Sequence, residues 1–215
     1  MNRIFIVDDH PVMRRGYANI IREEMDLEVC GEAGEGLEAL DKIRNTQPDL
    51  VISDLTLGSG MGGLELIKTL QTELPDLPIL VVSMHDESLY ADRALKAGAK
   101  GYVMKAEADT IIVKAVRRVL RGGIYVSEEV SEKILLHFAG GHLDKGQSPL
   151  EGLSDRELEV FEHLGHGRTT EEIAEAMLIS PKTVESYRSR IKEKLAVEHN
   201  TELIRRAVQW VESDA

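Results

Sequence analysis

The sequence predicts an α/β domain built on a parallel sheet, followed by a small domain made only of helices. Two observations support this fold class. Five short apolar runs alternate with amphipathic segments over about the first 120 residues, which is typical of a parallel sheet covered by helices on both faces. Beyond residue 153 every recognisable pattern has the period of a helix.

The predicted strands are apolar runs bounded by proline, glycine or acidic residues. They cover 3–7, 27–30, 49–53 and 79–83, with a weaker fifth run at 101–104. Between and after these runs, apolar residues recur at helical spacing, most clearly over 108–121. The other helices expected in this part are 11–24, 36–45, 63–73, 87–97 and 128–138.

The C-terminal helices are predicted from their capping residues. Capping-box patterns begin at Ser154 and at Thr169, and Ser180 precedes a proline at a first helical position. A fourth helix is expected over about 201–211. The chain is therefore expected to divide into three parts: a domain at 1–122, a Gly-rich linker with one helix at 123–149, and a domain of four helices at 150–215.

Composition excludes several classes of protein. The chain has 215 residues, of which 42% are hydrophobic and 30% charged, and this is too apolar for a disordered protein. No apolar run reaches the roughly 18 residues that span a bilayer, and the opening segment is too short and too acidic for a secretory signal. Cys30 is the one cysteine, so no internal disulfide forms. We therefore expect a soluble, cytoplasmic protein with no membrane association.

Three carboxylates are predicted to meet at the carboxyl edge of the sheet. Asp8 and Asp9 follow the first strand and Asp54 follows the third, while Ser83 follows the fourth and Lys105 the fifth. Ligands of doubly wound sheets bind at this edge, and carboxylates gathered there need a cation such as Mg²⁺. Each residue alone has a structural explanation as a turn, cap or surface residue. Their joint placement indicates phosphoryl transfer.

Residues 1–122 resemble response-regulator receiver domains, in the VDDHP motif at 7–11 and in the residues that follow each strand. The resemblance implies a flavodoxin-like, doubly wound sheet of five parallel strands. It also implies that Asp54 accepts a phosphoryl group from a sensor histidine kinase. Ser83 and Tyr102 match the switch pair of that family.

The resemblance further implies a metal site and a cation for the phosphoryl group. Asp9, Asp54 and the backbone carbonyl of Thr56 would hold Mg²⁺, with Asp8 assisting through water. Lys105 would contact the phosphoryl oxygens.

The loop after Asp54 departs from the receiver pattern. Gly58 stands where the family usually has proline, and LGSGMGG is one residue longer than usual. We expect a flexible loop, because glycine adopts most backbone angles at little cost. This departure keeps one alternative open, namely a regulator of the same architecture whose DNA binding is not controlled by phosphorylation.

The same loop contains GxGxxG over 58–63, between a strand and a helix, as a dinucleotide-binding motif would. It follows the third strand rather than the first, and a bound dinucleotide would place phosphates beside Asp54. A phosphatase with an aspartyl nucleophile would want a second aspartate at the position of Thr56. Both enzyme interpretations are weaker alternatives. We expect no enzyme activity beyond the domain's own phosphotransfer and dephosphorylation.

The predicted helix at 181–195 has an apolar face and a polar, basic face. Between 182 and 194 five basic residues outnumber two acidic ones, within a protein of net charge −12. A charged helix face is commonly just solvated. Here it follows a short helix and the turn 178–181, which is helix-turn-helix geometry. The polar face is therefore expected to enter a major groove of DNA.

The segment 153–211 resembles the LuxR-type DNA-binding domain, in LSDRELEVFEHLGHG and in EEIAEAMLISPKTVESYRSRIKEKL, with the helix-turn-helix at about 170–189. Tyr187 stands where that family usually has histidine. Together the two resemblances indicate the NarL/FixJ class of two-component response regulators. They imply a transcription regulator that is a homodimer when active and binds a two-fold-related promoter site on double-stranded DNA.

Roles follow for the helix that would read DNA and for the last helix. The basic residues are expected to contact phosphates, Glu185 to accept a hydrogen bond from cytosine N4, and Ser186 and Ser189 to reach base edges. The candidate DNA-binding residues are Lys182, Thr183, Glu185, Ser186, Ser189, Arg190, Lys192 and Lys194. The dimer contact implied by the resemblance is an apolar stripe of Leu203, Ile204, Ala207, Val208 and Val211.

Overall fold

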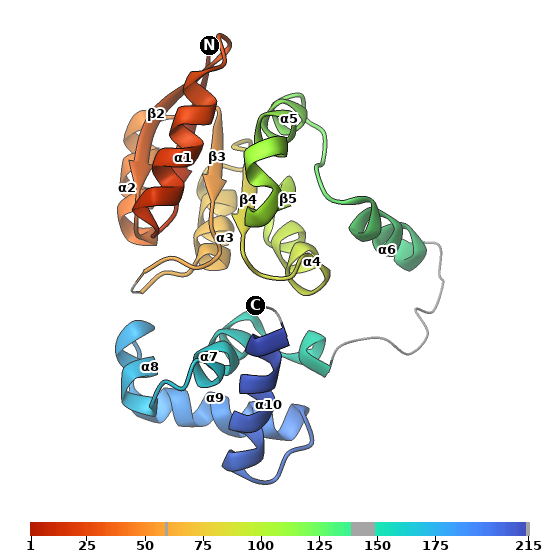
Figure 1. Cartoon of the computed structure of the whole chain (residues 1–215). Coiled ribbons are helices and arrows are strands. Elements are labelled where there is room, and N and C mark those ends of the chain that lie inside the picture. The colour runs from red at the N-terminus through yellow and green to blue at the C-terminus, as the bar shows by residue number, and fades with distance from the viewer. Residues whose placement is uncertain (59, 139–148, 214–215) are drawn as a thin grey trace. The chain divides into compact units, whose positions relative to one another are not determined.

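A five-stranded parallel sheet forms the centre of the N-terminal part of the chain in the computed structural model (Figure 1). The structure describes residues 1–58, 60–138 and 149–213. The strands are β1 (Asn2–Val7), β2 (Leu27–Ala33), β3 (Leu50–Ser53), β4 (Ile79–Ser83) and β5 (Gly101–Met104). Their order is β2–β1–β3–β4–β5, so the chain reverses direction across the sheet after β2. This order confirms the predicted flavodoxin-like, doubly wound sheet.

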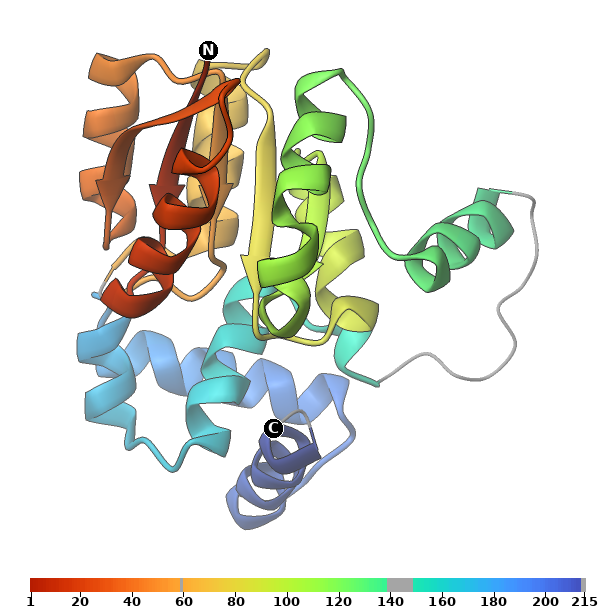
Figure 2. The same cartoon turned by 45° about the horizontal axis from the view of Figure 1, so that its top comes forward.

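Helices cover both faces of the sheet (Figures 1 and 2). One face carries α1 and α5, and the other carries α2, α3 and α4. Their bounds are α1 (Pro11–Arg22), α2 (Gly36–Thr46), α3 (Gly63–Glu73), α4 (Glu87–Ala97) and α5 (Ala108–Leu120). Because both faces are covered, β3 and β4 are buried along their whole length. This explains why these strands read as continuous apolar runs rather than as alternating ones.

Strand β2 extends to Ala33, which is three residues beyond its predicted end at residue 30. The register between β1 and β2 shifts between Ile4 and Phe5, so Cys30 is left as an extra residue at a bulge. Gly31 then lies against Phe5, where a Cβ atom would come within 2.4 Å of the aromatic ring. The apolar pattern of the sequence fades at this bulge, and only pairing with β1 continues the strand.

The chain beyond α5 returns to the edge of the sheet. It turns at Gly122, whose φ is +80°, and Tyr125 then pairs in parallel with Gly101 of β5. The next helix, α6 (Glu128–Phe138), packs on α4, where it buries Val130. The described part of the predicted linker is therefore packed on the sheet domain, and residues 139–148 of that linker lie outside the described residues.

Within the C-terminal unit, Gly141–Ala215, the described residues 149–213 form a short 3₁₀ turn, Pro149–Gly152, and four α-helices. These are α7 (Asp155–Gly165), α8 (Thr170–Ala176), α9 (Pro181–Lys194) and α10 (Asn200–Ser213). Both predicted capping boxes are present, and Ser180 caps α9 ahead of its first-turn proline. Helices α7 and α10 pack very closely, because a Cβ on Gly165 would lie 2.6 Å from the Ala207 carbonyl oxygen. Among the described residues, no helix is long and apolar enough to cross a bilayer.

Candidate functional site

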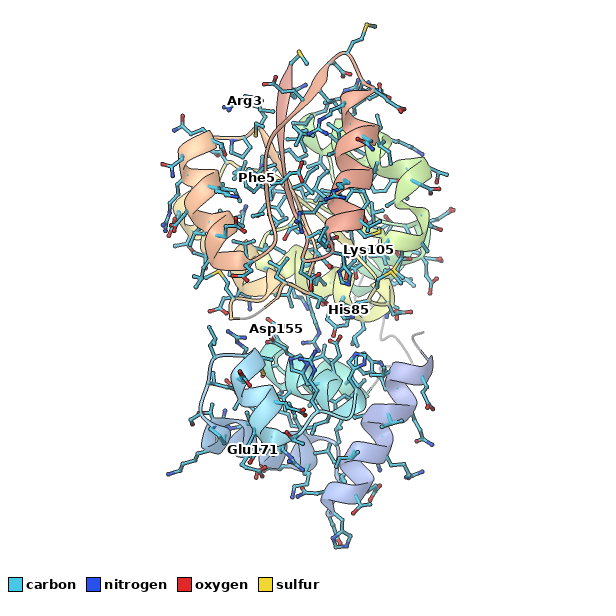
Figure 3. All side chains as sticks on the ribbon, turned by 60° about the vertical axis from the view of Figure 1, so that its left-hand side comes forward. Arg3, Phe5, His85, Lys105, Asp155 and Glu171 are labelled. Atoms are coloured by element: carbon cyan, nitrogen blue, oxygen red, sulfur yellow. The ribbon has the colours of Figure 1, made fainter. Side chains whose placement is uncertain are left out.

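The carboxyl edge of the sheet gathers the acidic residues predicted to form a site. Asp8 and Asp9 follow β1, and Asp54 follows β3, which is the direct neighbour of β1 in the sheet. Lys105 follows β5 and reaches the same place. In Figure 3, Lys105 and His85 lie at one end of the sheet domain and Arg3 at the other, with Phe5 between them. The strand order thus converts positions far apart in sequence into one cluster.

Lys105 bridges the two buried carboxylates. Its Nζ lies 2.7 Å from Asp8 Oδ2 and 2.8 Å from Asp54 Oδ2. Asp8 and Asp54 are only 1% and 3% exposed, and the Lys105 side chain is 3% exposed. The second oxygen of Asp54, Oδ1, accepts a hydrogen bond from the Leu55 backbone N–H at 2.7 Å. The fold therefore fixes the Asp54 carboxylate by two contacts, one to Lys105 directly after β5 and one to the backbone amide of the next residue, Leu55.

Burial makes the Asp54 carboxylate costly to keep charged. Desolvation raises the pKa of Asp54 to about 6, although the charge and hydrogen bond of Lys105 act in the opposite direction. Burial lowers the pKa of Lys105, but the carboxylates of Asp54 and Asp8 raise it by more, so the net shift is upward. The lysine therefore stays charged, and Asp54 is the group whose ionisation the environment opposes.

Asp9 and His10 complete a set of groups that could hold a cation. Asp8, Asp9, His10 and Asp54 each offer a ligand atom, and these atoms lie within 4.8 Å of one another. Oδ1 of Asp9 is buried and accepts no hydrogen bond of good geometry from the described residues. The Nδ1 atom of His10 lies 2.5 Å from it. Three carboxylates against one lysine leave an excess of negative charge, which fits a divalent metal ion. His10 is an addition to the predicted set, and its signal in the sequence was its place directly after the two aspartates.

Ser83 and Tyr102 meet at the turn after β4. Both are buried, at 0% and 1% exposure. The His85 backbone N–H lies 3.3 Å from Ser83 Oγ, and the Tyr102 hydroxyl donates to the His85 carbonyl at 2.8 Å. Burial raises the pKa of Tyr102, so its hydroxyl keeps its proton as a donor. His85 is thus held from both sides by the two predicted switch residues.

His85 also joins the loop after β4 to the loop after β3. Its Nε2 lies 2.8 Å from Thr56 Oγ1, and its ring stacks on Tyr90 of α4 at a centroid distance of 4.5 Å. The sequence pointed to Thr56 only for its backbone carbonyl, and that role stays a prediction. Thr56 and His85 are 29 residues apart in the sequence, and they come together because β3 and β4, which they follow, are neighbours in the sheet.

The polar face of α9 is open to solvent. Lys182, Glu185, Ser186, Ser189 and Arg190 are exposed. Opposite them, Val184 and Ile191 are fully buried against the other helices of the unit. A helix with this division can lay its polar side in a groove while its apolar side stays packed. Thr183 and Lys192, which were also predicted to contact DNA, are half-buried.

Comparison with known proteins identifies both parts of the chain. Residues 4–117 match the family model of the response regulator receiver domain, and residues 151–207 match that of bacterial regulatory proteins of the luxR family. The chain is 39% identical to the transcriptional activator protein ExaE of Pseudomonas putida, over 96% of this chain and 95% of that protein. It is 35% identical to the oxygen regulatory protein NreC of Staphylococcus carnosus (strain TM300), over 96% and 97% of the two chains.

A solved structure of similar architecture shows a DNA complex. RcsB of Salmonella enterica serovar Typhimurium, bound to promoter rprA in the presence of phosphomimetic BeF3−, matches with a TM-score of 0.69 and 27% identity, over 95% of this chain and 96% of that one. This chain is a two-component response regulator with a LuxR-type DNA-binding domain. It belongs to the NarL/FixJ class, whose members regulate transcription.

The glycine-rich loop of the regulator has a packing role close to Asp54. A Cβ on Gly63 would lie 2.2 Å from the Asp54 carbonyl oxygen, and the Gly63 N–H donates to the Leu55 carbonyl at 2.9 Å. Only glycine fits such an approach. The last glycine of the GxGxxG pattern is therefore explained by the close packing of the start of α3 on the backbone of Asp54 and Leu55. Ser59 lies outside the described residues, and the expected flexibility of this loop stays a prediction.

Lys194 has a partner inside the DNA-binding domain of the regulator. Its Nζ lies 2.6 Å from Oε2 of Glu157, whose side chain is 4% exposed, and the same oxygen accepts a hydrogen bond from the Ser154 N–H. This ion pair ties the end of α9 to the start of α7. Lys194 thus has a structural role, because a buried carboxylate needs its cation, and its predicted phosphate contact stays a prediction.

Two of the five predicted dimer residues face the interior of the same domain. Leu203 and Ala207 are 0% exposed, so they belong to the core rather than to a surface. Val211 packs toward α7, because its Cγ2 would lie 2.5 Å from a Cβ on Gly165. For Leu203 and Ala207 the interface prediction is wrong, because the helical period does not distinguish the face toward α7 from a face toward a second subunit. For Ile204, Val208 and Val211 it stays a prediction. Ile204 and Val208 are left with access to solvent.

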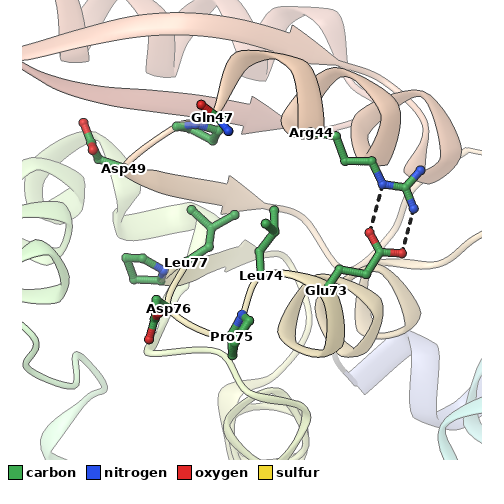
Figure 4. A pocket seen from close by; sticks show the side chains of 10 residues that line it. Arg44, Gln47, Asp49, Glu73, Leu74, Pro75, Asp76 and Leu77 are labelled. Atoms are coloured by element: carbon green, nitrogen blue, oxygen red, sulfur yellow. Dashed lines mark hydrogen bonds and ion pairs between the residues drawn. The ribbon is translucent and has the colours of Figure 1, made fainter.

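A shallow pocket at the opposite edge of the sheet takes no part in this site (Figure 4). It is lined by residues that precede β3 and β4, and the bidentate ion pair of Arg44 with Glu73 borders it. None of the predicted site residues lines it.

Proposed function

We propose that phosphorylation of Asp54 by a sensor histidine kinase, with Mg²⁺, switches the regulator between states that differ in their affinity for promoter DNA. The observation that carries the proposal is the position of the Asp54 carboxylate. It lies at the carboxyl edge of the sheet, 2.8 Å from the Lys105 ammonium and within reach of Asp8, Asp9 and His10 as a set of cation ligands. An acidic nucleophile, a lysine and a cation site are the components of a phosphoryl-transfer centre.

The transfer forms one bond and breaks one. A carboxylate oxygen of Asp54 attacks the phosphorus of a phosphohistidine on the kinase, while the P–N bond breaks and the histidine nitrogen keeps the electron pair and takes up a proton. Asp8, Asp9, Asp54 and the Thr56 carbonyl would hold Mg²⁺, which supplies positive charge between the carboxylates and the incoming phosphoryl group. Lys105 already lies beside the Asp54 oxygen and would neutralise charge on the phosphoryl oxygens.

The switch would run through Ser83 and Tyr102. The Ser83 hydroxyl is close to the His85 N–H, and the Tyr102 hydroxyl is bonded to the His85 carbonyl. If Ser83 turns to donate to a phosphoryl oxygen, its hydroxyl leaves the His85 backbone N–H. The turn at His85 would then move, and the Tyr102 hydroxyl would lose the His85 carbonyl as its acceptor. The backbone of Tyr102 in turn donates to Tyr125 at 2.8 Å, which leads to the linker.

The output is binding of α9 to a two-fold-related promoter site. The exposed basic and polar side chains of α9 support this role, and a homodimer would use the accessible apolar residues Ile204 and Val208. With a net charge of −12 the regulator would bind DNA weakly as a single subunit, so pairing of two α9 helices would supply affinity. A promoter-binding protein acts in the cytoplasm of a bacterial cell.

The test is treatment with a small phosphodonor, with and without Mg²⁺, followed by intact mass and oligomeric state. We expect a Mg²⁺-dependent gain of one phosphoryl group and formation of a dimer. The gain should be lost in Asp54→Ala and kept in Asp76→Ala, an exposed carboxylate away from the edge. Modification that survives in Asp54→Ala would contradict the site. No modification, together with specific DNA binding by the untreated protein, would support the regulator that does not depend on phosphorylation.

A further inference from the structure

Glu185, on the exposed face of α9, is held by two residues of the DNA-binding domain. Its Oε1 accepts hydrogen bonds from Thr170 Oγ1 at 2.8 Å and from Arg188 Nη1 at 3.0 Å. Arg188 Nη1 also donates to Thr170 Oγ1 at 2.7 Å, which closes a triangle of three polar groups. Thr170 is the first residue of α8, so the triangle joins the two helices of the helix-turn-helix.

The exposure of these side chains differs sharply. The Glu185 side chain is 52% exposed, whereas that of Arg188 is only 12% exposed. Nε of Arg188 is buried and has no hydrogen-bond partner among the described residues. A half-exposed ion pair contributes little to stability, and a buried N–H without an acceptor opposes it. Stability alone therefore does not account for an arginine in this place.

The orientation of the carboxylate is the other consequence of the triangle. Every contact that the structure shows for the Glu185 carboxylate involves Oε1. No contact among the described residues uses Oε2, so this oxygen of the half-exposed side chain is available to a ligand. The carboxylate loses much of its rotational freedom before any partner arrives, which reduces the entropy lost on binding.

We propose that Thr170 and Arg188 are positioning residues that hold Glu185 so that Oε2 accepts a hydrogen bond from the N4 amino group of a cytosine in the major groove. The proposal rests on the proposed role of α9 as the DNA-reading helix. Cytosine is the base whose major-groove edge offers an amino donor without an adjacent acceptor on the same base, and a carboxylate is its usual partner. Arg188 also offsets the repulsion between the Glu185 carboxylate and the DNA phosphates.

The neighbouring serines favour the same kind of base edge. Ser186 Oγ donates to the Lys182 carbonyl and Ser189 Oγ donates to the Glu185 carbonyl, each at 3.0 Å. Their hydroxyl protons are thus used within the helix, and toward the groove they present lone pairs. The middle of the exposed face of α9 therefore presents acceptors, with Lys182 and Arg190 available as cations for phosphates.

The experiment measures base preference with the full-length regulator in its DNA-binding form. A site is first selected from a randomised duplex library, and each C·G pair of the half-site is then replaced by T·A. For one position we expect the wild type to bind cytosine about tenfold more tightly than thymine, and Glu185→Ala, which removes the acceptor, to lose that ratio. Thr170→Val and Arg188→Lys should reduce the ratio to about threefold or less, whereas Thr170→Ser, which keeps the hydroxyl, should restore it.

The outcomes distinguish a role of Thr170 and Arg188 in orienting Glu185 from a role in stabilising the fold alone. If Thr170→Val and Arg188→Lys weaken binding equally for every duplex and leave the ratio unchanged, the triangle only supports the fold and the proposal is overturned. A ratio unchanged in Glu185→Ala shows that Glu185 reads no base. If the wild type selects a site but Arg190→Ala with Lys192→Ala binds it unchanged, the assignment of α9 to the groove fails instead, and this proposal fails with it.

Discussion

Asp54 is the residue at which burial and chemistry compete most directly. Its carboxylate is 3% exposed, and desolvation raises its pKa to about 6. An acid whose pKa is raised in the folded state stabilises the fold below its ordinary pKa of 3.8, and this contribution is lost as the pH rises through about 6. At neutral pH the regulator therefore keeps at the sheet edge a charged group that opposes folding, which is the group proposed to accept the phosphoryl group.

The first prediction follows from that charge. Asp54→Asn should raise the free energy of unfolding of the receiver domain at pH 8, by about 3 kcal/mol at most, and by about half of that at pH 5. Added Mg²⁺ should stabilise the wild type and have a smaller effect on the variant, because one carboxylate ligand is gone. Urea unfolding at the two pH values, with Mg²⁺ or with chelator, measures both effects. A variant less stable than the wild type at pH 8 would contradict the electrostatic account.

Tyr17 presents a second buried polar group beside the same cluster. Its side chain lies in the core between α1 and the sheet, and its hydroxyl has no hydrogen-bond partner among the described residues. Burial and then the charges of Asp8 and Asp54 raise the pKa of Tyr17, so the hydroxyl stays neutral.

Removing this hydroxyl should stabilise the receiver domain. We expect Tyr17→Phe to increase the free energy of unfolding by about 1 kcal/mol, since an unpaired buried hydroxyl loses its bonds to water on folding. Tyr125→Phe, at a half-buried phenol, should change it by less than about 0.5 kcal/mol. Thermal unfolding of the two variants provides the measurement. A destabilised Tyr17→Phe would show that the hydroxyl is bonded in solution.

Helix α9 combines a binding face with a structural end. Arg190 is exposed and Lys192 is half-buried on the side proposed for DNA, whereas Lys194 neutralises the buried Glu157 of α7. The same run of basic residues therefore serves two purposes, and variants should separate them.

Loss of the two DNA-facing cations should weaken binding without weakening the fold. Arg190→Ala combined with Lys192→Ala should lower affinity for all duplex sequences alike, and should reduce the slope of log affinity against log salt by about two for each bound subunit. Fluorescence anisotropy at several salt concentrations measures this slope. Arg205→Ala on α10 is the matched control. An unchanged slope would show that neither side chain meets a phosphate.

Loss of Lys194 should have the opposite pattern. Lys194→Met should lower the free energy of unfolding of the DNA-binding domain by about 1 to 2 kcal/mol, because Glu157 is left buried without its cation. Non-specific DNA affinity per folded molecule should change little. Urea unfolding followed by the fluorescence of Trp210, which lies against Phe161 of α7, reports on this domain. Lower affinity at full stability would restore Lys194 as a phosphate contact.

At the scale of the whole molecule, the receiver site and the linker share one strand. Tyr102 on β5 bonds to His85 through its hydroxyl, and its backbone N–H bonds to the Tyr125 carbonyl; the Tyr125 N–H bonds to the Lys100 carbonyl at 3.0 Å. Helix α6 is fixed to α4 as well, since Lys133 Nζ lies 3.1 Å from the Ser88 carbonyl oxygen. A displacement of β5 or α4 would therefore be transmitted to the linker through direct hydrogen bonds.

Phosphorylation should therefore change hydrogen exchange in the linker. We expect the amides of Tyr102 and Tyr125 to change their protection together when the regulator is treated with a phosphodonor, because they belong to the same bridge. Hydrogen-exchange mass spectrometry on peptides covering both residues measures this. Asp54→Ala should show no change. Altered exchange near Ser83 with an unaltered Tyr125 would confine the switch to the phosphorylation site.

The sequence alone was sufficient for much of this regulator, because the relevant signals are local. Helical period and capping residues such as Ser154 and Thr169 predicted the helices, since caps act within one turn. The apolar runs predicted β3 and β4, since both are buried on two faces. The residues that follow the strands predicted the acidic cluster, because parallel strands end at one edge.

Tertiary structure decided what depends on contacts between distant segments. The extra length of β2 required pairing with β1, and the inward orientation of Leu203 and Ala207 required α7 as their partner. The bridge from Lys105 to Asp8 and Asp54, and the hold of Thr170 and Arg188 on Glu185, join side chains from different elements. Periodicity shows which residues share a face of a helix or strand, but only packing decides what that face meets.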